Sequence, residues 1–212
     1  MMPHGLCAGR RPTAPAAFTL VEAVVAMAIL AIAGSALLLG IDSSLQTSTE
    51  SLEQTMANGL ARQLLDEAAG SRYSTYLESS GALVDTAHYP ALKPSASKAS
   101  TGTRELFTDS DDYNGFRRQP PVDRWGIPLG QEDVDKRRRH ASFYASTGLL
   151  DRWRQEIDVY YVSESDLATR LPAGQVSDYR AIEVRMVRVD AERGDRVLAT
   201  VRQVIAYVPP LP

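Results

Sequence analysis

The chain is 212 residues long with a formal net charge of −3, and these figures exclude several classes of protein. The length suits one modest globular domain, and the scattered Lys and Arg residues give no nucleic-acid footprint. The only cysteine, Cys7, excludes an intramolecular disulfide and a cysteine-based metal site.

Residues 1–17 form a basic leader without an acid. Arg10 and Arg11 supply its charge, and the small pair Ala16-Ala17 ends it. An ordinary secretory signal peptide places its small residues after the apolar run, whereas here they precede it. Because positive charge before an apolar segment stays in the cytoplasm, we expect the following chain to be directed outward.

Residues Phe18 to Ile41 form an apolar run of 24 residues, in which Glu22 is the only charge. A helix of ~20 residues spans the hydrocarbon core, so this run predicts a membrane helix. A carboxylate in such a segment costs about 2–3 kcal/mol toward the bilayer centre, and such groups are usually functional. Glu22 is therefore a candidate functional residue.

The run Phe18-Thr19-Leu20-Val21-Glu22, after a basic leader and before AVVAMAILAIAG, resembles the class III signal of type IV prepilins and type II secretion pseudopilins. The resemblance implies cleavage by prepilin peptidase between Ala17 and Phe18, followed by N-methylation of Phe18. Most members of this superfamily have Gly where this chain has Ala17. Since Ala is the nearest residue in size, we expect cleavage to persist.

In this superfamily the equivalent of Glu22 pairs with the amine of a neighbouring subunit, so the resemblance makes Glu22 the assembly residue. An unpaired buried charge costs several kcal/mol, and the pairing would set subunit register. The implied partners are other pilin or pseudopilin subunits, prepilin peptidase, an inner-membrane assembly platform and membrane lipid. The implied location is the bacterial inner membrane, with one span and a periplasmic head, and then a pilus or pseudopilus. No enzyme activity, cofactor or nucleic-acid partner is expected.

Helical periodicity continues past the apolar run to about Ala69, and Gly70-Ser71 predicts the end of the helix. Spacings of three, four and seven residues place these side chains on one face, which we expect to pack under the head: Leu45, Leu52, Met56, Leu60, Leu64 and Leu65. Gly34 and Gly40 lie in the apolar half, where they allow either local melting on assembly or close helix packing.

Three segments in the last third of the chain alternate apolar and polar residues and predict strands: Arg154–Val162, Arg180–Val189 and Arg196–Val208. Asp190–Asp195 predicts the hairpin loop between the last two. The period slips at Met186-Val187 and at Arg202-Gln203, which predicts a paired bulge. The expected inward side chains are Ile157, Val159 and Tyr161, then Ile182, Val184 and Met186, then Val197, Ala199, Val201, Val204, Ala206 and Val208.

The order of the segments LARQLLDEA, DSDDYNGF, PPVDRWG, RWRQEIDVYYV, YRAIEVRMVRV and VIAYVP resembles minor pilins of the mannose-sensitive haemagglutinin type. We therefore expect an α+β, pilin-like fold, with a long N-terminal helix packed on a small antiparallel sheet of three to four strands. The predicted parts are a leader (1–17), a transmembrane or filament-core helix (18–41), an amphipathic half (42–70) and a globular head with loops (71–212).

An acidic cluster lies in the connection before the strands. Asp109, Asp111 and Asp112, with Asn114, offer the oxygen ligands that calcium prefers. Their spacing lacks the glycine and terminal Glu of an EF-hand. The alternative is a turn in which the aspartates cap backbone N–H groups around Tyr113.

Other chemistry-bearing residues give weaker indications. The basic run Lys136–Arg139 follows three acids and is expected to be solvated, and Trp125 and Trp153 are expected to anchor the core or loops. The histidines lack the spacing of a zinc site or catalytic triad: His4, His88 and His140.

The leading hypothesis is a structural, non-enzymatic pilus subunit, and the runner-up is a pseudopilin of a type II secretion machine. A different class is a signal-anchored periplasmic enzyme or binding protein. That class predicts no cleavage at Phe18 and a head pocket with convergent polar groups, which the sequence does not indicate.

Overall fold

A computed structural model describes residues 19–74, 92, 98, 102–131, 142, 144–146 and 148–208. It forms two compact units, one up to Thr49 and one from Glu50 onward. Several predicted features lie outside the described residues: the leader (1–17), the cleavage site with Phe18, the Lys136–Arg139 run and the three histidines.

Helix α1 spans Leu20–Ala69, within two residues of its predicted bounds. Its sequence contains no proline, and alanine and leucine, which dominate its first half, are strong helix formers. At its end the Gly70 N–H donates to the Asp66 carbonyl (2.9 Å), and the Ser71 hydroxyl donates to the Ala68 carbonyl (2.6 Å). The helix therefore stops where Gly70-Ser71 predicts.

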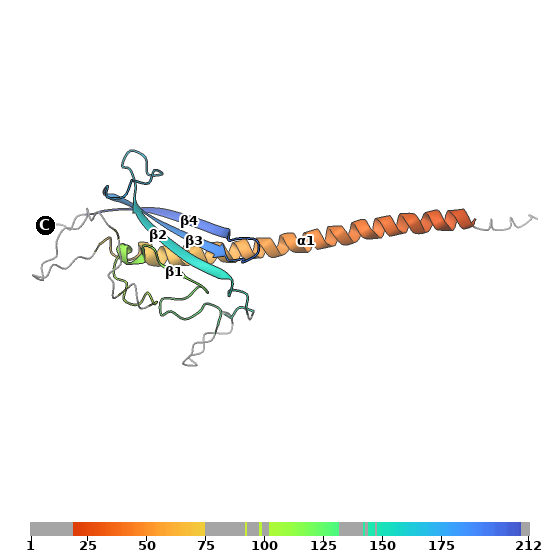
Figure 1. Cartoon of the computed structure of the whole chain (residues 1–212), viewed down its shortest axis with the longest axis horizontal. Helices are drawn as coiled ribbons and strands as arrows, with labels where there is room; N and C mark the ends of the chain where they lie inside the picture. The colour runs from red at the N-terminus through yellow and green to blue at the C-terminus, as the bar shows by residue number, and fades with distance from the viewer. Residues whose placement is uncertain are drawn as a thin grey trace, which may run out of the picture. The chain divides into compact units, whose positions relative to one another are not determined.

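Four antiparallel strands form one sheet in the order β1-β2-β3-β4 (Figure 1). They are β1 (Arg117–Arg118), β2 (Trp153–Tyr161), β3 (Tyr179–Arg188) and β4 (Arg196–Ala206). The three predicted strands are confirmed to within two residues at each end. The short β1 falls in a stretch that the sequence predicts only as a turn-prone connection. The fold is the expected pilin-like α+β arrangement.

The core lies between the sheet and the part of α1 that follows Glu50. Alternate residues of β2 and β3 face inward as predicted, including Ile157 and Val184. They meet a helix stripe made largely of alanines: Ala57, Ala61, Leu64, Leu65 and Ala68. Trp153 is buried in this core, whereas Trp125 is exposed on a loop.

The predicted inward stripe of α1 is wrong in its N-terminal part. Leu45 is 63% exposed and Leu52 is 61% exposed, while Met56 and Leu60 are only partly buried. The helix carries two neighbouring apolar stripes, and the sheet covers the alanine-rich one. Apolar spacing alone does not distinguish which stripe the head covers.

The bulge prediction is half right. The register between β3 and β4 shifts at Met186/Val187, where Met186 faces Ala199 and Val187 faces Val197, so Leu198 is the extra residue. No shift occurs at Arg202-Gln203, which pairs in regular order. As a consequence both Leu198 and Ala199 are buried and Val197 is exposed.

Beyond the bulge the inward residues of β4 also differ from the prediction. Val201 and Ile205 pack against the core. Val204 and Ala206, each next to Ile205 in the strand, belong to the opposite face of the sheet. The hairpin loop is confirmed: the Gly194 N–H donates to the Asp190 carbonyl (2.9 Å), with Gly194 at φ +84°.

Candidate processing and assembly site

The N-terminus of α1 is capped by a residue of the predicted processing signal. The Glu22 N–H donates to the Thr19 hydroxyl oxygen (3.3 Å), and the Ala23 N–H donates to the Thr19 carbonyl (3.1 Å). Thr19 and Glu22 have the spacing of a capping box, in which both residues satisfy helix-end N–H groups. The helix thus starts directly after the predicted cleavage position, and the acid lies in its first turn.

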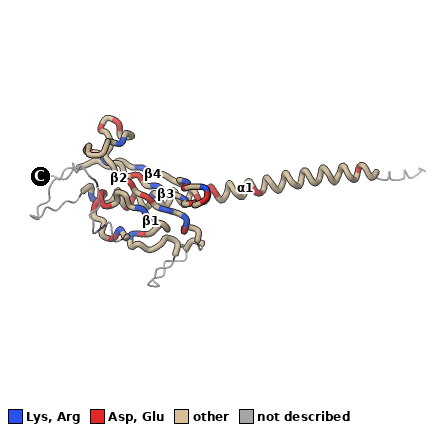
Figure 2. Tube along the Cα trace, viewed as in Figure 1, with Lys and Arg blue, Asp and Glu red and all other residues tan. Residues whose placement is uncertain are grey.

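Glu22 is the only charge between Leu20 and Ile41, and its side chain is exposed. Figure 2 shows the contrast between this nearly uncharged helix half and the region of the strands, which carries many basic and acidic residues. The large apolar side chains around it are exposed as well: Leu20, Val21, Val24, Val25, Met27, Ile29, Leu30, Ile32, Leu37, Leu38, Leu39 and Ile41. The unit up to Thr49 is therefore an apolar helix with one carboxylate.

By length and composition α1 is able to cross a membrane, since it contains an 18-residue window of mean hydropathy 2.6 with none of it buried. Backbone N–H and C=O groups in the bilayer must be satisfied internally, and a helix achieves this. The hydroxyl of Ser35 also donates within the helix, to the Ala31 carbonyl at 2.8 Å.

The two glycines of this half have no contact that requires them. A Cβ added at Gly34 or Gly40 would meet no atom of the described residues within 4 Å. Glycine lowers helix propensity relative to alanine, so the fold of this chain alone gives no reason for either. Local melting and close packing against another helix both remain open as explanations.

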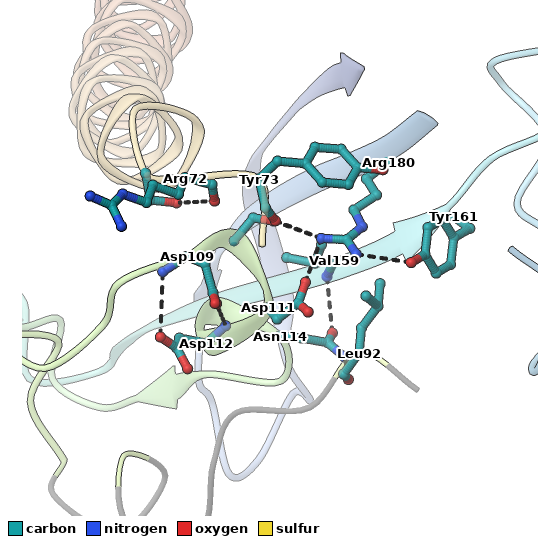
Figure 3. A network of polar contacts seen from close by, with 12 residues as sticks. Arg72, Tyr73, Leu92, Asp109, Asp111, Asp112, Asn114, Val159, Tyr161 and Arg180 are labelled. Atoms are coloured by element: carbon teal, nitrogen blue, oxygen red, sulfur yellow. Dashed lines mark hydrogen bonds and ion pairs between the residues drawn. The ribbon is translucent and has the colours of Figure 1, made fainter. Parts of the chain in front are cut away.

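The acidic cluster of the head forms a capped turn. Asp109, at the N-cap of the 3-10 helix η1 (Ser110–Tyr113), accepts the Asp112 N–H at 3.2 Å, and the Asp112 carboxylate accepts the Asp109 N–H at 3.4 Å. Asn114 ties the turn to its surroundings. It accepts the Val159 N–H (3.0 Å) and donates to the Leu92 carbonyl (2.6 Å) (Figure 3).

Two of the three calcium candidates face cations of the protein. The Asp111 carboxylate lies 2.6 Å from Arg180, and the Asp112 carboxylate lies 2.6 Å from Lys98. Among the described residues no group of three or more His, Cys, Asp or Glu side chains is arranged to hold a metal ion. The calcium hypothesis stays a prediction, in which the ion would have to displace both cations.

Arg180 organises the region between the helix end and the sheet (Figure 3). It is wholly buried, and one guanidinium nitrogen donates to both the Asp111 carboxylate (2.6 Å) and the Tyr73 carbonyl (2.6 Å). The other terminal nitrogen donates to the Tyr161 hydroxyl (2.9 Å), and the guanidinium lies 4.0 Å from the Tyr73 ring centroid. Burial raises the pKa of Asp111 to about 6, although Arg180 acts to lower it.

A second buried arginine joins the loops to α1. Arg104 makes a two-pronged contact with Glu67, at 3.0 and 2.9 Å, and donates to the Val122 carbonyl at 3.2 Å. The Tyr113 hydroxyl donates to the same carboxylate at 3.2 Å. Burial, together with Glu67, raises the pKa of Tyr113. Neither Arg104 nor Arg180 is recognisable from the sequence, because isolated arginines in a polar stretch or at a strand end resemble surface residues.

The other end of the packed helix segment carries a third ionic contact. Arg188 of β3 donates to both oxygens of Glu53, at 2.6 and 2.8 Å, and Arg196 of β4 lies 3.2 Å from the same carboxylate. Both bonds come from the same guanidinium nitrogen of Arg188, and hydrogen bonds between charged groups are stronger than those between neutral groups. The hairpin of β3 and β4 is thereby anchored to α1 at Glu53.

One comparison with known proteins gives a match. The family model of the prokaryotic N-terminal methylation motif matches residues 14–38, which include the predicted cleavage site, Glu22 and most of the apolar run. A search of curated proteins gives no match, and a search of solved structures gives none either.

Proposed function

We propose that this pilin-like protein, which carries the class III prepilin methylation motif, is a non-enzymatic structural subunit of a type IV pilus-like filament. In this proposal prepilin peptidase cuts between Ala17 and Phe18, and the new amino group of Phe18 is methylated. The apolar half of α1 then holds the chain in the inner membrane, with the head in the periplasm, until assembly.

The observation that carries this proposal is a single carboxylate in an otherwise apolar, exposed helix directly after the processing motif. Glu22 has no charged neighbour between Leu20 and Ile41. In lipid or in a filament core such a group is costly unless an opposite charge meets it. The methylated amine of Phe18 on a neighbouring subunit is a cation at the matching depth.

The decisive experiment has two readouts. Mass spectrometry of the membrane-extracted chain should show a polypeptide that begins at an N-methylated Phe18. Glu22→Ala should be processed normally but should be missing from sheared filaments, whereas Glu22→Asp, which keeps the charge, should retain partial incorporation. A native chain that starts at Met1, or a Glu22→Ala variant that enters filaments at the wild-type level, contradicts the proposal.

Within the superfamily we favour a minor pilin, and the order of the head segments favours the mannose-sensitive haemagglutinin type. The small sheet and the long connections around it support this choice, as does the absence of a second cysteine in the sequence. Quantitative mass spectrometry of purified filaments separates minor from major subunits by copy number.

A type II secretion pseudopilin is the alternative, because it shares every N-terminal feature. Deletion of the chain distinguishes the two. Loss of surface filaments with normal protein secretion supports the pilus, and loss of a secreted enzyme with normal pili supports the secretion machine.

A further inference from the structure

Strand β4 lies at one edge of the sheet, and its outer edge has no partner strand among the described residues (Figure 1). Its ladder pairs it with β3 alone. The bulge at Leu198 interrupts its first residues, but from Ala199 to Ala206 the register is regular and the sequence contains no proline or lysine. Bulges, prolines and lysines are common devices that keep an exposed strand edge from pairing. The stretch Ala199–Ala206 is therefore able to accept a further strand.

The opposite edge of the sheet, along β2, is covered by the protein itself. β1 pairs with part of β2, and beyond β1 the Asn114 side chain accepts the Val159 N–H at 3.0 Å. At the end of the strand the Leu171 N–H donates to the Tyr161 carbonyl at 2.9 Å. The open edge is thus a feature of β4 and not of the sheet in general.

The pairing with β3 determines which N–H groups of β4 point to the open edge. Directly after β4, the Tyr207 N–H donates to the carbonyl of Asp178, the residue before β3, at 2.8 Å. Hydrogen-bonding directions alternate along a strand, so the N–H groups of Thr200, Arg202 and Val204 point away from β3. These are the donors that an added strand would meet.

The side chains of β4 indicate the chemistry of such a strand. β4 contains no acid, and the exposed Arg202 donates to two uncharged groups, the Tyr160 hydroxyl (3.1 Å) and the Leu167 carbonyl. On the other face of the strand Val201 and Ile205 are only partly buried. A neighbouring strand with a carboxylate opposite Arg202 and apolar residues opposite Val201 and Ile205 would complement both faces.

A second copy of the chain does not fit this edge within one membrane. β4 begins beside Glu53, which Arg196 contacts at 3.2 Å, and the Tyr207 ring after its end lies 5.4 Å from the Tyr73 ring beyond the end of α1. β4 and the packed part of α1 therefore run in the same direction. Two-fold antiparallel pairing of two β4 strands would direct the two α1 helices oppositely. Two chains anchored in one membrane through the start of α1 cannot adopt that arrangement.

We propose that the open edge of β4 binds an extended segment of a different polypeptide, which adds an antiparallel strand opposite Ala199–Ala206 and carries a carboxylate opposite Arg202. In this mode of recognition, main-chain hydrogen bonds provide affinity and alternate side chains provide specificity. The choice of a different polypeptide rests on the proposed function, because it depends on anchoring in one membrane. The open edge itself does not depend on that function.

A synthetic peptide tests the edge directly. The fluorescein-labelled, C-terminally amidated sequence Val-Thr-Val-Glu-Val-Thr-Val matches Ala199–Ile205 in antiparallel order, with its glutamate opposite Arg202. Binding to the full chain in detergent micelles is measured by fluorescence anisotropy and by hydrogen exchange. We expect the amides of Thr200 and Val204 to become protected, whereas the amide of Val201 is protected already. Absence of binding, or binding that leaves the outward amides unprotected, overturns the proposal.

Two substitutions separate strand addition from other modes of binding. Thr200→Pro removes an N–H that points to the open edge, a change that an edge strand tolerates, and should abolish peptide binding in a chain that still folds. Arg202→Glu should weaken binding of this peptide about fivefold, and a peptide with lysine in place of glutamate should recover the loss. Arg117→Glu, at an exposed arginine of β1 on the other edge, is the matched control and should change neither affinity. Wild-type binding by a folded Thr200→Pro chain, or equal affinity of Arg202→Glu for both peptides, contradicts the proposal.

The outcomes separate this inference from the proposed function. Peptide binding in detergent requires no filament, so a chain that never enters a filament but binds the peptide in this way contradicts the proposed function alone. If the chain forms dimers in detergent that Thr200→Pro dissociates, the occupant is a second copy. In that case the proposal for β4 fails and the filament proposal stands.

Discussion

At the scale of single residues, buried charges hold the head together. Arg180 is wholly buried, and its partners are a carboxylate, a backbone carbonyl, a phenol and the Ser110 hydroxyl. The Nε atom of Arg180 has no hydrogen-bond partner among the described residues. A buried cation of this kind is costly to desolvate, and the remaining contacts must offset that cost.

Removal of the Arg180 guanidinium should be strongly destabilising. Arg180→Met leaves the Asp111 carboxylate facing an apolar side chain, and breaking a buried pair in this way costs about 3–5 kcal/mol. Urea unfolding of the full chain in detergent, followed by the fluorescence of the buried Trp153, measures the change. The double variant with Asp111→Asn should recover part of the loss, and a double variant that is no better than Arg180→Met contradicts the pairing.

The titration of Asp111 should make stability depend on pH. Burial raises the pKa of Asp111 from 3.8 to about 6, so the folded chain binds a proton more readily than the unfolded chain. Protonation of Asp111 therefore stabilises the folded chain. This stabilisation is fully present below the pKa that Asp111 has in the unfolded chain, and it is lost as the pH rises through about 6. The urea concentration at the midpoint of unfolding should therefore fall as the pH rises from 3.8 through about 6. Asp111→Asn should flatten that part of the profile, and an unchanged slope would refute the assignment.

At the scale of elements, α1 uses two neighbouring stripes for two purposes. The alanine-rich stripe that includes Ala57 and Ala61 packs under the sheet, and the stripe that includes Gly59 lines a hollow together with Trp125 and Leu129. The helix is therefore a compromise between stability of the head and the shape of an exposed surface.

Gly59→Ala should stabilise the isolated chain. The added methyl group meets open space, and alanine is about 0.8–1.0 kcal/mol better than glycine in a helix interior. Thermal unfolding of the full chain in detergent should show a higher midpoint for Gly59→Ala than for the wild type. A lower midpoint would mean that the helix, and not a partner, requires the glycine.

The contact between Glu67 and Arg104 should secure the loops that precede the sheet. Glu67→Ala leaves the buried Arg104 guanidinium and the Tyr113 hydroxyl without this acceptor, and we expect a loss of about 2–4 kcal/mol. Protection of the Arg104 and Phe107 amides in hydrogen exchange should fall as well. Glu67→Gln keeps an acceptor oxygen and should lose less, while equal losses for both variants would argue against a role for the charge.

The sequence predicts the elements better than their faces. Strands β2 and β3 follow from regular alternation, and α1 follows from a long stretch without proline that Gly70 ends. The two-residue strand β1 has too few positions to alternate and was missed. Leu45 and Leu52 were assigned to the core because periodicity identifies a stripe without identifying what covers it.

The candidate sites are likewise predictable from the sequence only where their residues lie close together in the chain. The motif around Glu22 is local in the sequence, so it is recognised without a structure. The networks of Arg104 and Arg180 join residues that are 18 to 107 positions apart, and no local pattern predicts them. The phase of β4 was wrong for a related reason, because the extra residue of the bulge, Leu198, depends on its pairing with β3.

At the scale of the whole molecule, the proposed processing would determine whether the chain can leave the membrane for a filament. Ala17 occupies the position before the predicted cut, where the resemblance to prepilins implies a small residue. Ala17→Gly should accelerate conversion of the precursor in a pulse-chase experiment, and Ala17→Leu should block it. The blocked precursor should remain in the membrane fraction and stay out of filaments. Normal maturation of Ala17→Leu would place the cut elsewhere.

Any axial pull on α1 is transmitted to the head partly through two arginine–glutamate clamps, one from Arg188 to Glu53 and one from Arg104 to Glu67. The two glutamates are 14 positions apart in the helix, which is roughly 21 Å at ~1.5 Å per residue. Each clamp joins a carboxylate of the helix to a guanidinium of the head, so the packed segment of α1 cannot slide along the head while both pairs hold. The head is thus fastened at two points along the rod that bears the load.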